Sequence, residues 1–285
     1  IFKIPKRILA VTLSVAVILA ATIAATARAE QDSVVLPVIM YHHISANSNA
    51  LGEYVVSPEQ FRSDLVYLKE QGYYAEGGHP GYDWFYNRRN VADWFGFDNY
   101  YFFEDRYAVE GDALMMDSPF FADLLELYEG FISTHTTPYF SFSVTYQNHG
   151  PYSDQLLYDG EHIFAKDQGY SIEAYRILNN YLWGINMTDG AIEKLIESLR
   201  EDDEPVVVVL FGDHNPWLGD NSYVYDELGI SLDRGSEEGF YNYYSTPYVI
   251  WANDAAKEVT GSSFEGDGGS FSPCFLMNRL FDELG

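Results

Sequence analysis

The stretch PVVVVLFGDH, from Pro205 to His214, decides the fold of this chain. Its first part, Pro205 to Phe211, is continuously apolar and rich in β-branched valine, which predicts a strand buried on both faces. Strands of this kind lie in parallel sheets that helices cover on both sides. Gly212 ends the run, and Asp213 and His214 follow directly. The stretch therefore indicates an α/β fold with two polar side chains at the carboxyl end of a strand.

Further segments are predicted to be strands of the same sheet. The run VVLPVIM (Val34 to Met40) is apolar and β-branched, and PYFSFSVTY (Pro138 to Tyr146) alternates aromatic with small residues. A shorter run, Tyr248 to Trp251, has the same character. Helical patterns separate these strands, so the order of elements predicts an α/β fold with a largely parallel sheet flanked by helices.

The helices are predicted from start signals and from periodicity. Ser57-Pro58 and Ser118-Pro119 each place a capping serine before a proline, as in the first turn of many helices. The segments Ser171 to Ile185 and Ala191 to Arg200 are amphipathic, because their apolar residues recur every three to four positions. We expect two separate helices in this last region.

The composition limits both the size and the partners of the protein. The chain has 285 residues, of which 47% are hydrophobic, enough for one large domain with a substantial core. Its 43 acidic and 16 basic residues give a formal net charge of −27, and such a surface repels nucleic acid. Cys274 is the only cysteine, which excludes an internal disulfide and a paired-cysteine metal site. We therefore expect no nucleic-acid partner.

Residues 1–29 have the order of an export segment. Basic residues, Lys3 among them, precede the apolar run Ile8 to Ala27, and Ala27-Arg28-Ala29 resembles a cleavage site between small residues. The run is also long enough, at roughly 20 residues, to cross a bilayer if it is not cleaved. We expect either a signal peptide or a membrane anchor, so that the rest of the chain acts outside the cytoplasm.

The pair Asp213-His214 is the first candidate site. Ligands of open α/β sheets bind beyond the carboxyl ends of strands, and this pair follows such an end. One carboxylate and one imidazole are also suitable ligands for a divalent metal. The alternative is a loop aspartate that caps the next turn beside a surface histidine.

His79, Arg88 and His149 are further candidates. His149 follows the strand predicted at 138–146, so we expect it at the same edge of the sheet, with a purely structural loop residue as the alternative. Bases are scarce in this chain, and Arg88 lies close to His79 in a segment rich in aromatic residues. Arginine is the usual bidentate partner of phosphate or sulfate. These residues predict an anion-binding pocket, and an ordinary surface ion pair is the alternative for Arg88.

From His79 almost to its end, the chain resembles the lipoteichoic acid synthase-like sulfatases of the alkaline phosphatase superfamily. The resemblance rests on motifs that are specific in combination. They are HPGYDWFYNRRN (His79 to Asn90), GFDNYYF (Gly96 to Phe102), PYFSFSVTYQNHGPY (Pro138 to Tyr152), VVVVLFGDHNPWLG (Val206 to Gly219) and TPYVIWAN (Thr246 to Asn253). The resemblance implies an alkaline phosphatase/sulfatase-like α/β fold for residues 75–285.

The same resemblance implies a function and a set of site residues. Members of this family transfer or hydrolyse phosphate or sulfate esters on the outer face of the membrane. Asp213 and His214 would then be ligands of a divalent metal, Mn²⁺ or Mg²⁺. His79, Arg88 and His149 would bind the anionic head group of a lipid or polymer, a glycerol phosphate or a sulfate ester, and His149 would also be catalytic.

Residues 34–73 resemble a different family, the start of secreted polysaccharide deacetylases. The match is LPVIMYHHI (Leu36 to Ile44) and YVVSPEQFRSDLVYLKEQGYY (Tyr54 to Tyr74), without the Asp-Asp and paired-His motifs of that family. The acidic metal ligand and the Thr or Ser nucleophile of the sulfatases would also belong before His79, where this segment stands. We therefore predict an apparent chimera. It consists of a deacetylase-like fragment at 30–74 and a sulfatase-like domain at 75–285 whose N-terminal part is missing or replaced.

These observations lead to one expected function and two alternatives. We expect an extracytoplasmic, metal-dependent sulfatase or phosphoglycerol transferase-like enzyme, secreted or anchored, that acts on envelope polymers at the membrane surface. Its activity is expected to be impaired, because the nucleophile and one metal ligand are missing. The alternatives are a polysaccharide deacetylase and a non-catalytic envelope protein that keeps only the anion pocket.

Overall fold

The computed structural model describes residues 43–44, 55–56, 62–63, 66, 69–70, 72–110, 114–158, 169–272 and 275–284. The predicted export segment at 1–29, the predicted strand at 34–40 and the helix start at Ser57 lie outside these residues. Within the described ranges, no helix combines the length and the apolar composition that crossing a bilayer requires.

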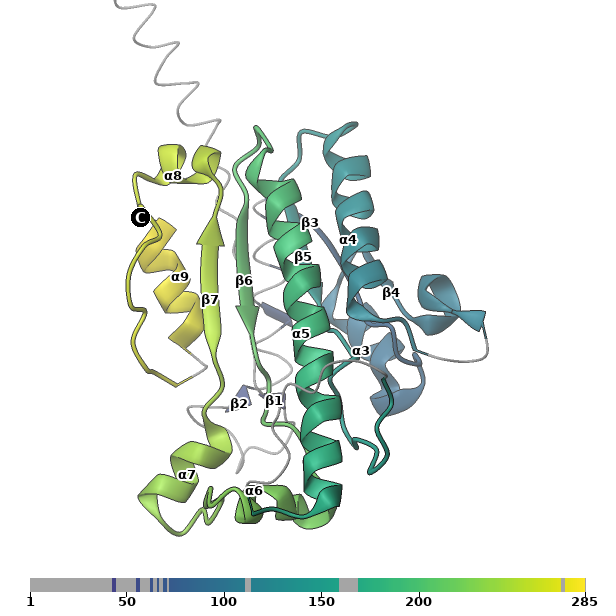
Figure 1. Ribbon diagram of the computed structural model, residues 1–285. Helices are drawn as coiled ribbons and strands as arrows, with labels where there is room; N and C mark the ends of the chain where they lie inside the picture. The colour runs from purple at the N-terminus through teal and green to yellow at the C-terminus, as the bar shows by residue number, and fades with distance from the viewer. Residues whose placement is uncertain are drawn as a thin grey trace, which may run out of the picture.

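A three-stranded parallel sheet in the order β4-β3-β5 forms one half of the molecule (Figure 1). The central strand β3 (Tyr74–Gly78) pairs with β4 (Asn99–Tyr101) and with β5 (Tyr139–Ser143). Phe140 on β5 is only 1% exposed, because alternate residues of a strand point to the same face and this face is the core. The strand predicted within 138–146 is therefore confirmed, whereas its two parallel neighbours β3 and β4 were not predicted as strands.

The other half contains β6 (Val207–Phe211) and β7 (Tyr248–Ala252), which pair in antiparallel fashion. Both strands were predicted, but their direction adds an antiparallel pair to a sheet that was expected to be largely parallel. Figure 1 shows the reason, since α6 and α7 gather at the lower end of β6 and no crossover helix carries the chain back to its upper end. β6 is also less buried than its sequence predicts, because only Val207 is buried and the next four residues are half-buried.

Two long helices, α4 (Asp117–Ile132) and α5 (Ile172–Arg200), pack against each other and lie in front of the β4-β3-β5 sheet in Figure 1. The start of α4 agrees with the Ser118-Pro119 signal. The expectation of two separate helices at 171–185 and 191–200 is wrong, because α5 is continuous through both. The polar residues between the two patterns do not interrupt the helix, since Thr188, for example, hydrogen-bonds to neighbouring segments.

The remaining elements are short. They are β1 (His43–Ile44), β2 (Val55–Val56), the 3₁₀ turns η1 (Phe85–Asn87) and η4 (Asp220–Ser222), the π-helical turn η2 (Phe103–Tyr107), α3 (Arg88–Phe95), α6 (Tyr223–Glu227), α7 (Glu237–Tyr244), α8 (Asp254–Thr260) and α9 (Leu276–Leu284). β1 and β2 pair with each other in parallel and form a sheet of their own.

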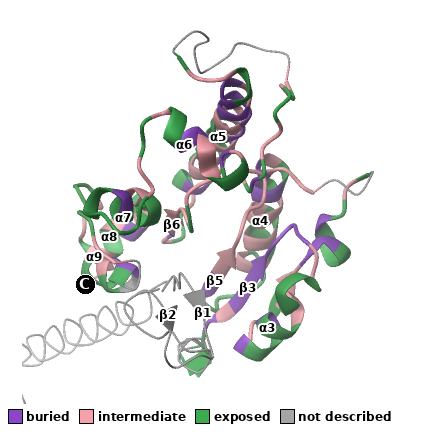
Figure 2. Ribbon diagram, turned by 90° about the horizontal axis from the view of Figure 1, so that it is seen from below, coloured by how far each residue is buried: buried purple, intermediate pink, exposed green. Residues whose placement is uncertain are grey.

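One buried cluster joins the two main sheets. It contains side chains from β3, β5, β6 and β7 and from three helices, among them Ala75, Phe95, Phe140, Val207, Ala252, Ala256 and Leu280. Figure 2, coloured by burial, shows β3 buried over most of its length, whereas α3 and α7 are largely exposed. The β4-β3-β5 and β6-β7 sheets therefore share one hydrophobic core.

Candidate active site

His79 follows β3 directly and is held in a buried position, with 7% of the residue exposed. Its amide donates to the Tyr101 carbonyl over 2.9 Å, and the Gly81 amide donates to its Nδ1 over 2.7 Å. Since an amide can only donate, Nδ1 carries no hydrogen, and neutral His79 holds its ring proton on Nε2. Burial, and then the nearby charge of Arg88, lowers the pKa of His79 to about 3. At neutral pH the ring is therefore an uncharged N–H donor.

Arg88 begins α3 and rests on the loop that follows β3. Its Nη1 donates to the Tyr82 carbonyl over 3.3 Å, and its guanidinium lies 5.2 Å from the ring centre of Phe85 and 5.8 Å from that of Tyr86. Burial lowers the pKa of the Arg88 guanidinium, which nevertheless stays charged at any ordinary pH. These contacts fix the direction of the side chain without neutralising its charge.

The two consecutive arginines differ in their partners. Arg89 donates to Asp83 over 2.6 Å and to Asp105 over 2.7 Å. Arg88 forms no ion pair with any acidic residue in the part of the chain that the structure describes. In a protein with a formal net charge of −27, a half-buried arginine without a carboxylate is available to an anion from solution.

Gly81 makes the close approach of His79 and Arg88 possible. A Cβ atom at this position would lie 2.7 Å from Cε1 of His79 and 2.9 Å from Nη1 of Arg88. His79 and Arg88 also line a cavity of about 190 Å³, whose other walls are apolar and include Phe102 and Phe142. The His-Pro-Gly sequence after β3 thus brings an imidazole and a guanidinium together in the wall of a small cavity.

The ring of Tyr146 lies between those of His79 and His149 and contacts both. The ring centre of Tyr146 lies 5.8 Å from that of His79, and Tyr146 stacks on His149 at 5.0 Å with an interplanar angle of 12°. Nδ1 of His149 donates to the Gly150 carbonyl over 2.7 Å, which leaves a lone pair on Nε2 of the neutral ring. The sequence did not single out Tyr146, although its position between the strand and His149 was a usable signal.

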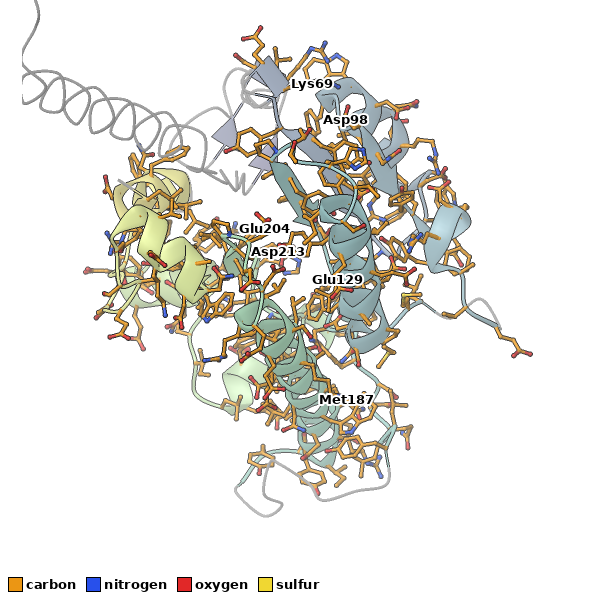
Figure 3. All side chains as sticks on the ribbon, turned by 90° about the horizontal axis from the view of Figure 1, so that it is seen from above. Lys69, Asp98, Glu129, Met187, Glu204 and Asp213 are labelled. Atoms are coloured by element: carbon orange, nitrogen blue, oxygen red, sulfur yellow. The ribbon has the colours of Figure 1, made fainter. Side chains whose placement is uncertain are left out.

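β6 delivers Asp213 and His214 to the same edge. The ring centres of His149 and His214 are 5.9 Å apart, with the planes nearly perpendicular at 86°. Nδ1 of His214 donates to the Asn215 carbonyl over 2.8 Å, so Nε2 again keeps its lone pair, and Oδ2 of Asp213 lies 3.6 Å from it. Both side chains are more than half exposed, at 67% for Asp213 and 55% for His214. Figure 3 is viewed along the strands. The labels of Asp213, which follows β6, and Glu204, which precedes β6, therefore lie close together.

Polar residues of α4 and α5 hold the loop that carries His149. Thr188 donates to Oδ2 of Asp117 over 2.5 Å and accepts from Nδ2 of Asn148 over 2.7 Å. The Asp117 amide donates to the side-chain oxygen of Gln147 over 2.9 Å. Burial raises the pKa of Asp117, and the Thr188 hydroxyl opposes that effect. Sequence reasoning missed this network, because its members come from segments far apart in the chain.

The described residues supply part of a metal site. Oδ2 of Asp213 and Nε2 of His214 both carry lone pairs and face each other across 3.6 Å, an arrangement that a shared cation or proton stabilises. Within the described ranges, however, no three acidic, histidine or cysteine side chains are grouped so that they could hold a metal ion. Divalent ions in proteins take at least three to four protein or water ligands. The pair therefore fits a divalent metal only as part of a larger donor set.

The structure thus brings the predicted site residues together. His79 and Arg88 meet around Gly81, Tyr146 links them to His149, and His149 contacts His214 beside Asp213. The expected shared edge at the carboxyl ends of β3, β5 and β6 is present. The roles of these residues in binding and catalysis stay predictions.

A family model described as Sulfatase matches residues 33–269, well over half of the chain. The chain belongs to the sulfatase family. The predicted relationship to the sulfatases and the predicted α/β fold are thereby confirmed. The match also includes residues 34–73, and their interpretation as a deacetylase-like fragment stays a prediction.

Two curated relatives are longer proteins than this sulfatase-family chain. A protein of Rhizobium meliloti (strain 1021) named for cyclic beta-1,2-glucan modification is 28% identical over 240 residues, which is 82% of this chain and 35% of that protein. The lipoteichoic acid synthase-like protein YvgJ of Bacillus subtilis (strain 168) is 26% identical over 167 residues, or 55% of this chain and 25% of that protein. The chain thus spans about a third or less of the length of these relatives.

A similar solved structure is the C-terminal periplasmic domain of EcEptC from Escherichia coli in complex with Zn. The TM-score is 0.56 at 16% identity, and the match covers 78% of this chain and 60% of that one. A similarity at this level of identity concerns the fold alone, and it agrees with the layered α/β architecture described above.

Proposed function

We propose that this sulfatase-family chain binds the phosphate or sulfate group of an ester in the cell envelope, at the edge formed by His79, Arg88 and His149. One observation carries the proposal. An arginine without a described carboxylate partner and three imidazole rings meet at the carboxyl ends of β3, β5 and β6. N–H donors fixed around a guanidinium are the groups that bind tetrahedral oxyanions in proteins.

The three proposed binding residues would have different roles, set by where each side chain carries its protons. Arg88 offers parallel N–H donors and a full positive charge. His79 stays neutral, so its Nε2–H can donate to an anion oxygen without a change of charge. His149 has its Nδ1 proton engaged by the Gly150 carbonyl, so its Nε2 is the atom that would accept and return a proton during the reaction.

Asp213 and His214 would hold a divalent metal, for which we propose Mn²⁺ or Mg²⁺. Such an ion, when bound, neutralises charge on the transferred group and activates an oxygen nucleophile. The remaining donors would come from water or from residues outside the described ranges, because Asp213 and His214 supply only one oxygen and one nitrogen ligand.

The reaction class that fits these groups is transfer or hydrolysis at a phosphate or sulfate ester. The proposed substrate is the anionic head group of a lipid or polymer, such as a glycerol phosphate or a sulfate ester, outside the cytoplasm at the membrane surface. Within the described ranges, no serine or threonine can be assigned as the nucleophile. We therefore propose that turnover by this chain is impaired while anion binding is retained.

The test compares binding with turnover in the full chain. Calorimetry with glycerol phosphate and inorganic sulfate, with and without Mn²⁺, measures binding, and a nitrophenyl phosphodiester and nitrophenyl sulfate report turnover. We expect saturable binding of at least one anion, lost in Arg88→Ala. If the folded wild-type chain binds neither anion, the proposal is wrong.

A second candidate function is an envelope protein that binds the anionic head group without any chemistry. The incomplete donor set around Asp213 and His214 favours it. Binding of glycerol phosphate with no product at saturating Mn²⁺ would select this candidate. The deacetylase alternative predicts release of acetate from chitin fragments, which the same preparation can test.

A further inference from the structure

Trp217 is exposed in the loop that follows the proposed metal ligands. Its exposed fraction is 51%, and it lies three residues after His214. Trp84, Trp94 and Trp183 each contact another aromatic ring. Trp217, in contrast, has neither a ring contact nor an indole hydrogen bond with any residue that the structure describes. Its indole therefore offers solvent a flat apolar face and one N–H donor.

The backbone on both sides of Trp217 is held in place. The Tyr225 hydroxyl donates to the Pro216 carbonyl over 2.9 Å, and Figure 1 shows α6, which contains Tyr225, at the lower end of β6. Leu218 is only 3% exposed and belongs to a buried cluster with Val224. The exposed position of Trp217 is thus fixed by its two neighbours, as a preorganised contact for a ligand requires.

The same segment packs against the loop that carries His149. A Cβ atom at Gly150 would lie 3.0 Å from the carbonyl oxygen of Trp217 and 3.3 Å from its Cβ, so the two loops approach each other closely at this glycine. The Gly150 carbonyl also accepts the hydrogen bond from Nδ1 of His149 over 2.7 Å. Trp217 therefore borders the candidate site, directly beside the residue that follows His149.

The surface next to Trp217 is acidic, which limits the ligands that it can bind. The ring of Tyr223 packs against Gly219, two residues after Trp217. The pKa of Tyr223 is raised by burial and then by the nearby carboxylates of Glu227, Glu173, Asp154 and Asp220. These carboxylates repel an anionic lipid surface or a second phosphate group. They can accept hydrogen bonds from the hydroxyl groups of a neutral ligand.

We propose that Trp217 determines the specificity of the site, by stacking on a neutral sugar ring of the substrate next to the phosphate or sulfate group at Arg88 and His149. The faces of a pyranose ring carry C–H bonds, whose partial positive charge suits the electron-rich face of an indole. The hydroxyl groups at the rim of the ring are then free to bond to the indole N–H of a neighbouring position or to carboxylates.

This inference rests on the function proposed above and makes its substrate class narrower. The ester would be a sugar phosphate or a sugar sulfate within a saccharide chain. Trp217 would contact the sugar, and it would leave the binding of the anionic group unchanged. The two contributions can therefore be measured separately.

Affinities for ligands with and without a sugar ring test the proposal in the full chain. Calorimetry compares inorganic phosphate, glycerol phosphate, glucose 1-phosphate and glucose 6-phosphate. We expect at least one glucose phosphate to bind about 3- to 10-fold more tightly than glycerol phosphate, as stacking on an aromatic face allows. Equal or weaker binding of both glucose phosphates to the wild-type chain would contradict the proposal.

Variants of two exposed tryptophans assign this preference to a residue. Trp217→Ala should abolish the preference for the glucose phosphate and leave the affinity for inorganic phosphate unchanged, whereas Trp217→Phe keeps a ring face and should keep most of the preference. Trp94→Ala removes a tryptophan that is 41% exposed on α3 and is the control, with no expected change. A preference that persists in folded Trp217→Ala would overturn the assignment.

Nuclear magnetic resonance of the tryptophan indoles separates this inference from the proposed function. The indole N–H signal of Trp217 is identified by its absence in Trp217→Phe. It should shift on addition of neutral oligomers of glucose or N-acetylglucosamine, and less on addition of inorganic phosphate. If the wild-type chain binds no phosphate, the proposed function is wrong, and the response to neutral sugars still decides the role of Trp217. No shift with any neutral sugar or glucose phosphate would overturn the inference even if phosphate binds.

Discussion

The β4-β3-β5 half and the β6-β7 half of the molecule differ in how far their candidate site residues are buried and held in place. The β4-β3-β5 half buries His79, fixes its ring proton and holds Arg88 against aromatic rings. The β6-β7 half carries Asp213 and His214 more than half exposed, on a strand with only one buried residue. Packing thus preorganises the proposed anion-binding residues, whereas the proposed metal ligands are exposed and need further donors from water or from residues outside the described ranges.

Matched truncations in the two halves should give the largest effect. Phe140→Ala in β5 removes a ring that is 1% exposed and should lower the free energy of unfolding by about 3–5 kcal/mol. Phe211→Ala in the half-buried part of β6 should cost about 1–2 kcal/mol. Urea unfolding measures both. Equal losses at the two positions would remove the contrast between the two halves.

The consecutive arginines provide the next test. Arg88→Ala should weaken binding of inorganic phosphate by about 10- to 100-fold, because a hydrogen-bonded charge is lost from the site. Arg89→Ala loses two partly exposed ion pairs and a contact with the Phe102 ring, and should weaken phosphate binding by no more than about 5-fold. Calorimetry gives both affinities, and thermal unfolding checks that each variant is folded. A larger loss in Arg89→Ala than in Arg88→Ala would refute the assignment of the anion site.

The burial of His79 should appear in the pH dependence of stability. The unfolded state binds a proton near the ordinary pKa of 6.5, whereas folded His79 stays neutral down to about 3. Its contribution is therefore fully present above pH 6.5 and is lost as the pH falls toward 3, at up to about 1.4 kcal/mol per pH unit. His79→Asn should flatten the profile of unfolding free energy between these limits, and the exposed His135→Asn is the control. An unchanged slope in His79→Asn would contradict the buried neutral ring.

The smallest effect is expected from the network that supports His149. Thr188→Val removes a hydroxyl that bonds Asp117 and Asn148 and should lower the free energy of unfolding by about 1 kcal/mol. It should also shift the ring resonances of His149. Thr260→Val is the control: its hydroxyl donates to the Ala256 carbonyl and accepts from the Ser262 amide, and its loss should leave His149 unchanged. If the His149 resonances stay in place in Thr188→Val, the network does not position this residue.

The sequence predicted the elements of the fold better than their arrangement. The runs at 138–146 and 205–211 predicted β5 and β6 correctly, because strand propensity and hydrophobic periodicity can be read from a short segment alone. The antiparallel return of β7 depends on where the segment 212–247 folds, which no local pattern encodes. The continuity of α5 was missed because Thr188 and Gly190, between the two amphipathic patterns, have low helix propensity, and the tertiary hydrogen bonds of Thr188 are visible only in the structure.

The sequence predicted which residues lie in the candidate site, but not their protonation or their hydrogen-bond and ion-pair partners. Asp213 and His149 follow apolar strands, and strand ends of an α/β sheet carry ligands. The protonation of His79 depends on the Gly81 amide and on burial, which are visible only in three dimensions. The difference between Arg88 and Arg89 likewise rests on which carboxylates the fold brings near.

The central claim is that the Asp213-His214 pair and the anion-binding cluster form one site for a divalent cation and its anionic partner. Nuclear magnetic resonance of the histidine rings during titration with Mn²⁺ tests this most directly, because the paramagnetic ion broadens nearby signals. We predict that the signals of His214 and His149 broaden first, followed by His79, while His135 at the opposite end of β5 broadens last. Broadening of His135 before His214, or no selective broadening of His214 at saturating Mn²⁺, would contradict the account.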